Sequence, residues 1–87
     1  MTSRVTPSFK RGLAALSASD QQAAKRAYRQ FVADPFHNSL RFKKLAGHKS
    51  LWSVRVTLSV RAVAHRDGEA IVWVWIGSHN EFDSRFG

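Results

Sequence analysis

The dipeptide Asp67-Gly68 lies between two stretches in which large apolar residues alternate with smaller or polar ones. Asp-Gly is typical of a two-residue hairpin turn, because glycine tolerates the positive φ angle that such turns need. The flanking segments Ser59–Arg66 and Ala70–Ile76 are therefore predicted to be antiparallel strands, the second ending at Gly77. Residues 52–56 alternate in the same way and predict a further strand, joined to the hairpin by a tight turn near 57–59.

The turn also predicts which face of the sheet each side chain occupies. If Asp67 and Gly68 alone form it, Arg66 pairs with Glu69, and the large residues of the last strand meet small partners. The predicted pairs are Ala64 with Ile71, Ala62 with Trp73, and Val60 with Trp75. The predicted core face carries Trp52, Val54, Val56, Val60, Ala62, Ala64, Ile71, Trp73 and Trp75. The opposite face is predicted to carry Ser53, Arg55, Thr57, Ser59, Arg61 and His65 beside Val72, Val74 and Ile76.

Two helices are predicted before the strands. Thr6-Pro7 is typical of a helix start and predicts a helix over 7–17. Residues 19–22 have the spacing of a capping box, and the second helix is predicted to end near Ala33, before Asp34-Pro35. The following basic segment is predicted to be irregular, and Ala46–Ser50 to be a loop. Three apolar residues are predicted to anchor it: Leu40, Phe42 and Leu45.

These elements predict an α+β fold in which two N-terminal antiparallel helices pack on one face of a small antiparallel three- to four-stranded sheet. At 87 residues, the chain is expected to form a single domain over 1–87. The longest apolar run, 70–76, is too short to span a bilayer, and no signal peptide is recognisable in the first ten residues. A cytoplasmic protein without a membrane partner is expected, and the lack of cysteine suits a reducing compartment.

The charge predicts the class of partner. Fourteen Lys and Arg against six Asp and Glu give a formal net charge of +8, which attracts RNA, DNA or an acidic protein. Arg55 and Arg61 are predicted on neighbouring strands of the same face, where two guanidiniums can grip a phosphate. Lys43, Lys44 and Lys49 could extend this patch. Scattered arginines that only keep the sheet soluble are the alternative.

The four histidines are candidates for proton transfer, because the histidine pKa lies near neutrality. No metal site is predicted from His37, His48, His65 and His79, because no helical pair of ligands has the required spacing. His79 follows the last strand and Gly77, where chains often expose functional groups. By strict alternation it would point into the core, so its exposure requires the strand to end or bulge at Gly77. Asp83, four residues later, could orient it.

The element order resembles the RelE/ParE family of toxins from bacterial type II toxin–antitoxin pairs. The resemblance covers nearly the whole chain and rests on short segments in order: Leu40–Gly47 (LRFKKLAG), Trp52–Val56 (WSVRV), Arg61–Val63 and Ile76–His79. It implies a short strand at Ser3–Thr6 on the sheet edge. It also implies an acidic antitoxin that covers the basic face or displaces the tail, and contact with DNA only through the antitoxin complex.

The RelE-like branch of this family cuts mRNA on the ribosome by attack of the RNA 2′-hydroxyl on the adjacent phosphate, with no metal or cofactor. Carried over by resemblance, Arg55 and Arg61 supply positive charge, and His79 is the acid or base, with His65 and His48 as weaker candidates. Lys43, Lys44, His48 and Lys49 would contact the message or ribosomal RNA. Where several nucleases of the family carry a C-terminal tyrosine, this tail has Phe82 and Phe86. The alternatives are a ParE-like poison of DNA gyrase and a non-catalytic nucleic-acid-binding domain.

Overall fold

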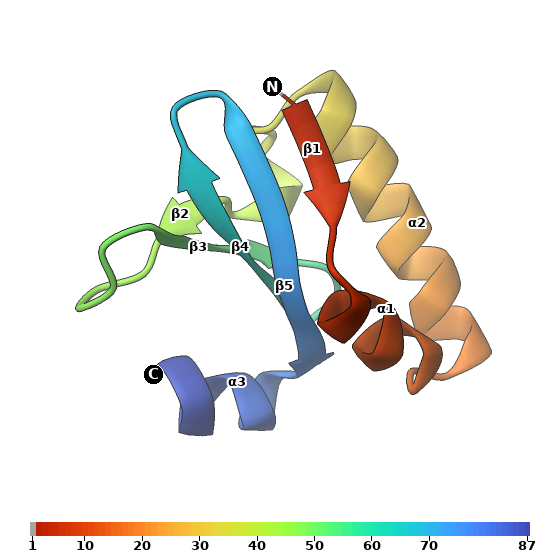
Figure 1. Ribbon diagram of the computed structural model, residues 1–87. Coiled ribbons are helices and arrows are strands. Elements are labelled where there is room, and N and C mark those ends of the chain that lie inside the picture. The colour runs from red at the N-terminus through yellow and green to blue at the C-terminus, as the bar shows by residue number, and fades with distance from the viewer. Residues whose placement is uncertain (1) are drawn as a thin grey trace.

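A five-stranded mixed sheet forms the centre of the protein, in a computed structural model that describes residues 2–87. The strand order is β1-β5-β4-β3-β2, with β1 parallel to β5 and every other pair antiparallel. Figure 1 shows α1 and α2 together on one side of the sheet and α3 apart from them, beyond the end of β5. The elements are β1 (Thr2–Val5), α1 (Pro7–Ala14), α2 (Ala18–Ala33), the 3₁₀ helix η1 (Asn38–Leu40), β2 (Lys43–Lys44), β3 (Leu51–Arg55), β4 (Val60–Asp67), β5 (Ala70–Ser78) and α3 (His79–Phe86).

The α+β class and the two N-terminal helices are as predicted, but the three- to four-stranded antiparallel sheet is wrong. The sheet gains β1 at one edge, because the backbone N–H groups of Thr2 and Thr6 donate to the carbonyls of Glu69 and Trp73. This strand lies within one residue of the position that the resemblance implied. At the other edge, β2 pairs with β3 within the segment that was predicted to be irregular.

The helix boundaries follow their caps. Thr6 is the N-cap of α1, and its side chain accepts from Phe9 N, as the Thr-Pro signature predicts. The predicted end at residue 17 and the capping box at 19–22 are wrong. Ser17 itself caps α2 by accepting from Asp20 N, so α1 has to stop at Ala14. Asp34 ends α2 as predicted.

The hairpin is confirmed, but its register is not. Asp67 pairs with Ala70, so Gly68 and Glu69 form the turn, and Gly68 takes the positive φ of 58°. The resulting shift is two residues, which leaves each side chain on its predicted face as far as the pair of Ala64 with Trp73.

Beyond that pair, a β-bulge changes the faces of β5. Val63 lies opposite Trp75, so Val74 is the extra residue on this strand. The bulge turns Trp75 away from the helices and puts Ile76 in its place against them. The predictions for these two residues are therefore wrong, as is the pairing of Val60 with Trp75, because Val60 pairs with Ser78.

The core is consequently divided between the two faces of the sheet. The face under α1 and α2 buries Phe31, Leu40 and Trp73, among others, and holds every predicted core residue except Trp75. On the opposite face, Trp75 packs with Val63 and Leu45 and is covered by Phe82 and Phe86 of α3. The three predicted anchors Leu40, Phe42 and Leu45 are all buried.

The C-terminal helix α3 was not predicted. Ser78 is its N-cap, and a reciprocal capping box joins Ser78 and Glu81: Glu81 N donates to Ser78 Oγ, and Ser78 N donates to the Glu81 carboxylate. Two aromatic residues on one side of this helix, Phe82 and Phe86, lie over the indole of Trp75. No helix within residues 2–87 is long and apolar enough to cross a membrane.

The close approach of α1 to β5 is directly testable. A Cβ atom on Gly12 would lie 2.7 Å from the carbonyl oxygen of Ile76, and backbone on both sides prevents relief. Gly12→Ala is therefore expected to lower the free energy of unfolding by about 1–3 kcal/mol, measured by urea denaturation. In a helix without this contact, the same change stabilises by about 0.5–1 kcal/mol, so an increase in stability would contradict the proposed packing.

Candidate functional site

Two arginines lie side by side at one end of the sheet. Arg55, the last residue of β3, pairs directly with Arg61 on β4, and Arg61 in turn lies opposite Gly77 on β5. The predicted proximity of the two arginines is confirmed. The third strand contributes only a glycine in this row, and the indole of Trp75 lies over that glycine.

The charge of Arg61 is held in an unfavourable environment. Burial lowers the pKa of Arg61, the nearby Arg55 lowers it further, and Arg41 adds a smaller effect in the same direction, whereas Asp83 raises it. The group still remains a cation at physiological pH, since an arginine does not lose its proton in proteins. Within residues 2–87, neither Arg55 nor Arg61 makes a salt bridge. The arrangement therefore favours an external anion.

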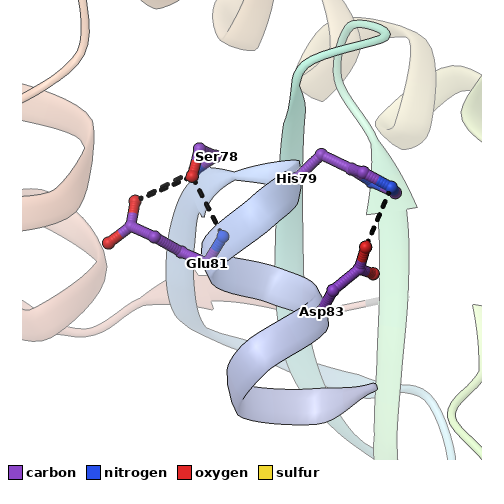
Figure 2. A network of polar contacts seen from close by, with 4 residues as sticks. All are labelled: Ser78, His79, Glu81 and Asp83. Atoms are coloured by element: carbon purple, nitrogen blue, oxygen red, sulfur yellow. Dashed lines mark hydrogen bonds and ion pairs between the residues drawn. The ribbon is translucent and has the colours of Figure 1, made fainter.

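His79 is the first residue of α3 and lies close to this row. Its backbone N–H donates to the Ser59 carbonyl at 2.7 Å, which ties the start of the helix to the turn before β4. Its Nε2 atom lies 3.2 Å from Oδ2 of Asp83, so the predicted partner is the observed one. Figure 2 shows this pair on one side of α3, with Ser78 and Glu81 on the other side.

The exposure of His79 does not depend on the strand ending at Gly77. Strand β5 continues to Ser78, but the bulge at Val74 has already reversed the alternation, and the helix then turns the chain. The His79 side chain is consequently 42% exposed and lies on the same side of the sheet as the two arginines.

The two ring nitrogens of His79 have different surroundings. Nε2 lies next to the Asp83 carboxylate, an arrangement that is consistent with a proton on Nε2. Nδ1 is buried and has no hydrogen-bond partner within residues 2–87. The ring stacks against Phe82, with 18° between the planes. To exchange a proton with a bound molecule, His79 must therefore turn away from Asp83 or expose Nδ1.

The other predicted histidines lie elsewhere. His65 is four residues from Arg61 along β4, about 13 Å at the rise of a strand, and its Nδ1 hydrogen-bonds with Ser50 Oγ. His48 lies edge-on to the ring of Phe86 at the far end of α3. The structure thus does not bring His65 or His48 to the arginine pair.

The predicted lysines do not form one patch. Lys43 pairs with Ser53 and Lys44 with Trp52, so consecutive positions of β2 face opposite sides of the sheet. Lys49 is exposed in the loop that follows. Of these three residues, Lys43 lies on the same face as Arg55.

The sequence reasoning missed Arg41. Its φ of 47° places it in the left-handed region, where residues other than glycine are uncommon and which is frequent at functional sites. This exposed residue is close enough to Arg61 to lower the pKa of that group. Its only sequence signal is a place in the basic run Arg41–Lys44, and nothing there indicates the backbone conformation. Among residues 2–87, no third imidazole or carboxylate joins His79 and Asp83 in a possible metal-ligand set.

The fold is that of small bacterial and archaeal toxins. The structure of the RelB–RelE antitoxin–toxin complex from Methanococcus jannaschii matches with a TM-score of 0.76 at 13% identity, covering 95% of this chain and 98% of that one. YafQ from Escherichia coli BL21(DE3) matches with 0.74 at 9% identity, covering 92% and 94%. The YoeB/ParE toxin from Agrobacterium tumefaciens matches with 0.70 at 20% identity, covering 91% and 99%.

The family model of the ParE-like toxin domain matches residues 19–84. The chain therefore belongs to the ParE-like toxin family, within the RelE/ParE group of toxin–antitoxin systems. No curated protein sequence matches it significantly. The family matched by the sequence and the fold shared with the solved toxins agree with the resemblance inferred from the short motifs.

The position of α3 depends on Gly77. A Cβ atom there would lie 2.6 Å from Cζ2 of the Trp75 indole, the ring on which Phe82 and Phe86 rest. We expect Gly77→Ala to shift that ring and loosen α3, so that amides of α3 exchange hydrogen faster. Gly12→Ala is the matched control, because its added methyl group would clash with β5 at Ile76, on the side that faces α1. Equal acceleration in both variants would show that α3 is not seated specifically by Trp75.

The environment of Arg61 predicts a gain in stability when its charge is removed. Because burial and two neighbouring cations all disfavour the Arg61 charge, Arg61→Gln is expected to leave the unfolding free energy unchanged or raised. The gain should shrink as salt is added, because salt screens the repulsion from Arg55 and Arg41. Urea denaturation at low and high salt measures both effects. A clear loss of stability at both salt concentrations would mean that Arg61 has a structural role.

Proposed function

We propose that this protein is the toxin of a type II toxin–antitoxin pair and acts in the cytoplasm as a ribosome-dependent mRNA endonuclease. The observation that carries this proposal is the pair of unneutralised arginines, Arg55 and Arg61, beside the His79–Asp83 pair. Positive charge next to a group that can move protons is the combination that cleavage of an RNA backbone requires.

In the proposed reaction, the RNA 2′-oxygen forms a bond to the adjacent phosphorus, and the bond from phosphorus to the 5′-oxygen breaks. The products are a 2′,3′-cyclic phosphate and a free 5′-hydroxyl, so no water or cofactor is consumed. Negative charge accumulates on the phosphorane, where Arg61 and Arg55 stabilise it, with Arg41 contributing from its place close to Arg61.

His79 is proposed to move the protons. One proton leaves the 2′-hydroxyl and another reaches the departing 5′-oxygen, and an imidazole can act as the base or as the acid. Asp83 orients the ring through Nε2. A bound phosphate beside Arg61 would compete with Asp83 for the protonated imidazole and so help the ring to turn toward the substrate.

The partners follow from the charge and the family. A net charge of +8 favours an acidic antitoxin, and the related M. jannaschii structure contains toxin and RelB antitoxin together. Lys43, Lys44, Lys49 and His48 are proposed to contact the message or ribosomal RNA, and DNA would be met only through the antitoxin complex. His65 is proposed only as a reserve proton carrier, because of its distance from Arg61.

A second candidate function is inhibition of DNA gyrase. It is favoured by one observation, the match to the ParE-like family model. A gyrase poison needs no proton carrier, so His79 would then be dispensable. Brief induction in cells separates the two functions: mRNA cleavage leaves new 5′ ends within codons and stops translation, whereas gyrase poisoning induces DNA-damage signalling. An inactive nucleic-acid-binding domain would do neither.

The proton-transfer role predicts the effect of three substitutions. His79→Ala should abolish growth arrest and lower the cleavage rate by about 10²–10⁴-fold while antitoxin binding is preserved. Asp83→Asn should give a smaller loss with a changed pH dependence of the rate, because it affects only the orientation and environment of the ring. Arg61→Gln should lower the rate by about 10²–10³-fold.

Growth curves, mapping of transcript 5′ ends and a pull-down with the antitoxin measure these effects. Lys10→Ala, which removes one positive charge at an exposed position of α1, is the control and should retain full toxicity. Undiminished toxicity of His79→Ala would refute the role of His79 and leave the arginines without a proton carrier.

A further inference from the structure

A separate polar pocket lies between α2 and the end of β3. It has a volume of about 290 Å³, and its polar lining consists of Arg26, Gln30, Ser39, Arg55 and Thr57. None of its lining residues is acidic. The pocket is therefore cationic, and every charged side chain in its wall is an arginine.

The side of α2 that borders the pocket carries Arg26, which is exposed, and Gln30, which is half-buried. Arg26 and Gln30 are four residues apart on the helix and so project from the same side, toward the end of β3. Within residues 2–87, neither side chain makes a hydrogen bond or an ion pair. The guanidinium of Arg26 and the amide of Gln30 are therefore both available to bind a molecule in the pocket.

The hydroxyl group of Thr57 completes the donor set. Its Oγ1 atom accepts a hydrogen bond from Ser59 N at 3.0 Å, which fixes the side chain and leaves the hydroxyl proton available for donation. A phosphate oxygen accepts from guanidinium, amide and hydroxyl donors alike, and a guanidinium can bind it through two parallel hydrogen bonds.

Arg55 connects this pocket to the candidate site. It lines the pocket and is also the strand partner of Arg61. An anion in the pocket and an anion at Arg61 would therefore lie on either side of the same arginine. Successive phosphates of one nucleic-acid strand provide two linked anions of this kind.

We propose that this pocket binds a second phosphodiester of the RNA strand, next to the one held at Arg55 and Arg61. The inference rests on the proposed nuclease function for the identity of the strand. In this arrangement Arg26 is a binding residue that fixes the direction of the strand across the site, and it takes no part in bond breaking.

The test uses the full-length protein and a short RNA in which every 2′-hydroxyl is methylated, so that binding is measured without cleavage. Arg26→Ala should weaken binding by about tenfold at moderate salt, the value of one charge-assisted contact. The slope of log affinity against log salt should fall in magnitude by about 0.7, as expected for the loss of one phosphate contact.

Arg29→Ala is the matched control. It removes the same charge from the same helix three residues later, where Arg29 borders an apolar groove with Val5 and Tyr28. We expect a change of no more than about twofold for Arg29→Ala, because only the long-range field is altered. Equal losses for the two variants would overturn the proposal, and Arg26→Lys should restore the salt slope but only part of the affinity.

Inorganic phosphate identifies the source of the anion. Titration followed by NMR should shift the side-chain amide of Gln30 in the wild type and not in Arg26→Ala. If phosphate binds the pocket but RNA affinity is insensitive to Arg26, the pocket is a free-phosphate site and the proposal fails. If Arg26 governs RNA binding but no transcript is cut on induction, the pocket stands and the proposed nuclease function fails.

Discussion

The bulge at Val74 is the constraint on which the rest of the structure depends. Without it, Trp73 and Trp75 would point to the same face, and Ile76 instead of Trp75 would lie on the face opposite α1 and α2. With it, Trp73 packs under the helices and Trp75 packs on the other side. One extra residue therefore gives a small sheet two apolar clusters and a place for a C-terminal helix.

The second cluster positions the candidate site. Phe82 and Phe86 rest on Trp75, and the capping box at Ser78 fixes where α3 begins. The first residue of that helix, His79, is thereby held beside the turn that leads into β4 and toward Arg61. Apolar side chains hold these elements in place, and Arg55 and Arg61 lie at their edge without a salt bridge within residues 2–87. Burial and like charge both act against the Arg61 cation, and under the proposed function this loss of stability would serve to bind a phosphate.

Much of the fold could be predicted from local patterns, but the site could not. Alternation and the Asp-Gly turn identify the hairpin and most of the core, since a register error of two residues preserves the faces. The bulge leaves no sequence signal, because the run Ile71–Ile76 contains no glycine or proline to indicate it. The α3 helix had two recognisable signals, the Ser78–Glu81 spacing of a capping box and the pair Phe82 and Phe86 one helical turn apart. The left-handed conformation of Arg41 depends on tertiary packing and had none.

The same geometry gives Phe82 and Phe86 a packing role at the place where the family resemblance suggested a tyrosine. The rings of Phe82 and Phe86 serve as apolar contacts for Trp75, and Phe82 also stacks against His79. A phenol in their place would bring a hydroxyl group to an apolar cluster, at a cost unless that group found a partner. The phenylalanines of the tail thus pack α3 against the sheet. Under the proposed function, proton transfer is carried out by His79 at the start of this helix. Since Asp83 already engages that histidine, the arrival of an anion at Arg61 is the event that would shift the local balance of charge. Under the proposed function, recognition of the phosphate and release of His79 from Asp83 would then both depend on the same arginine cluster.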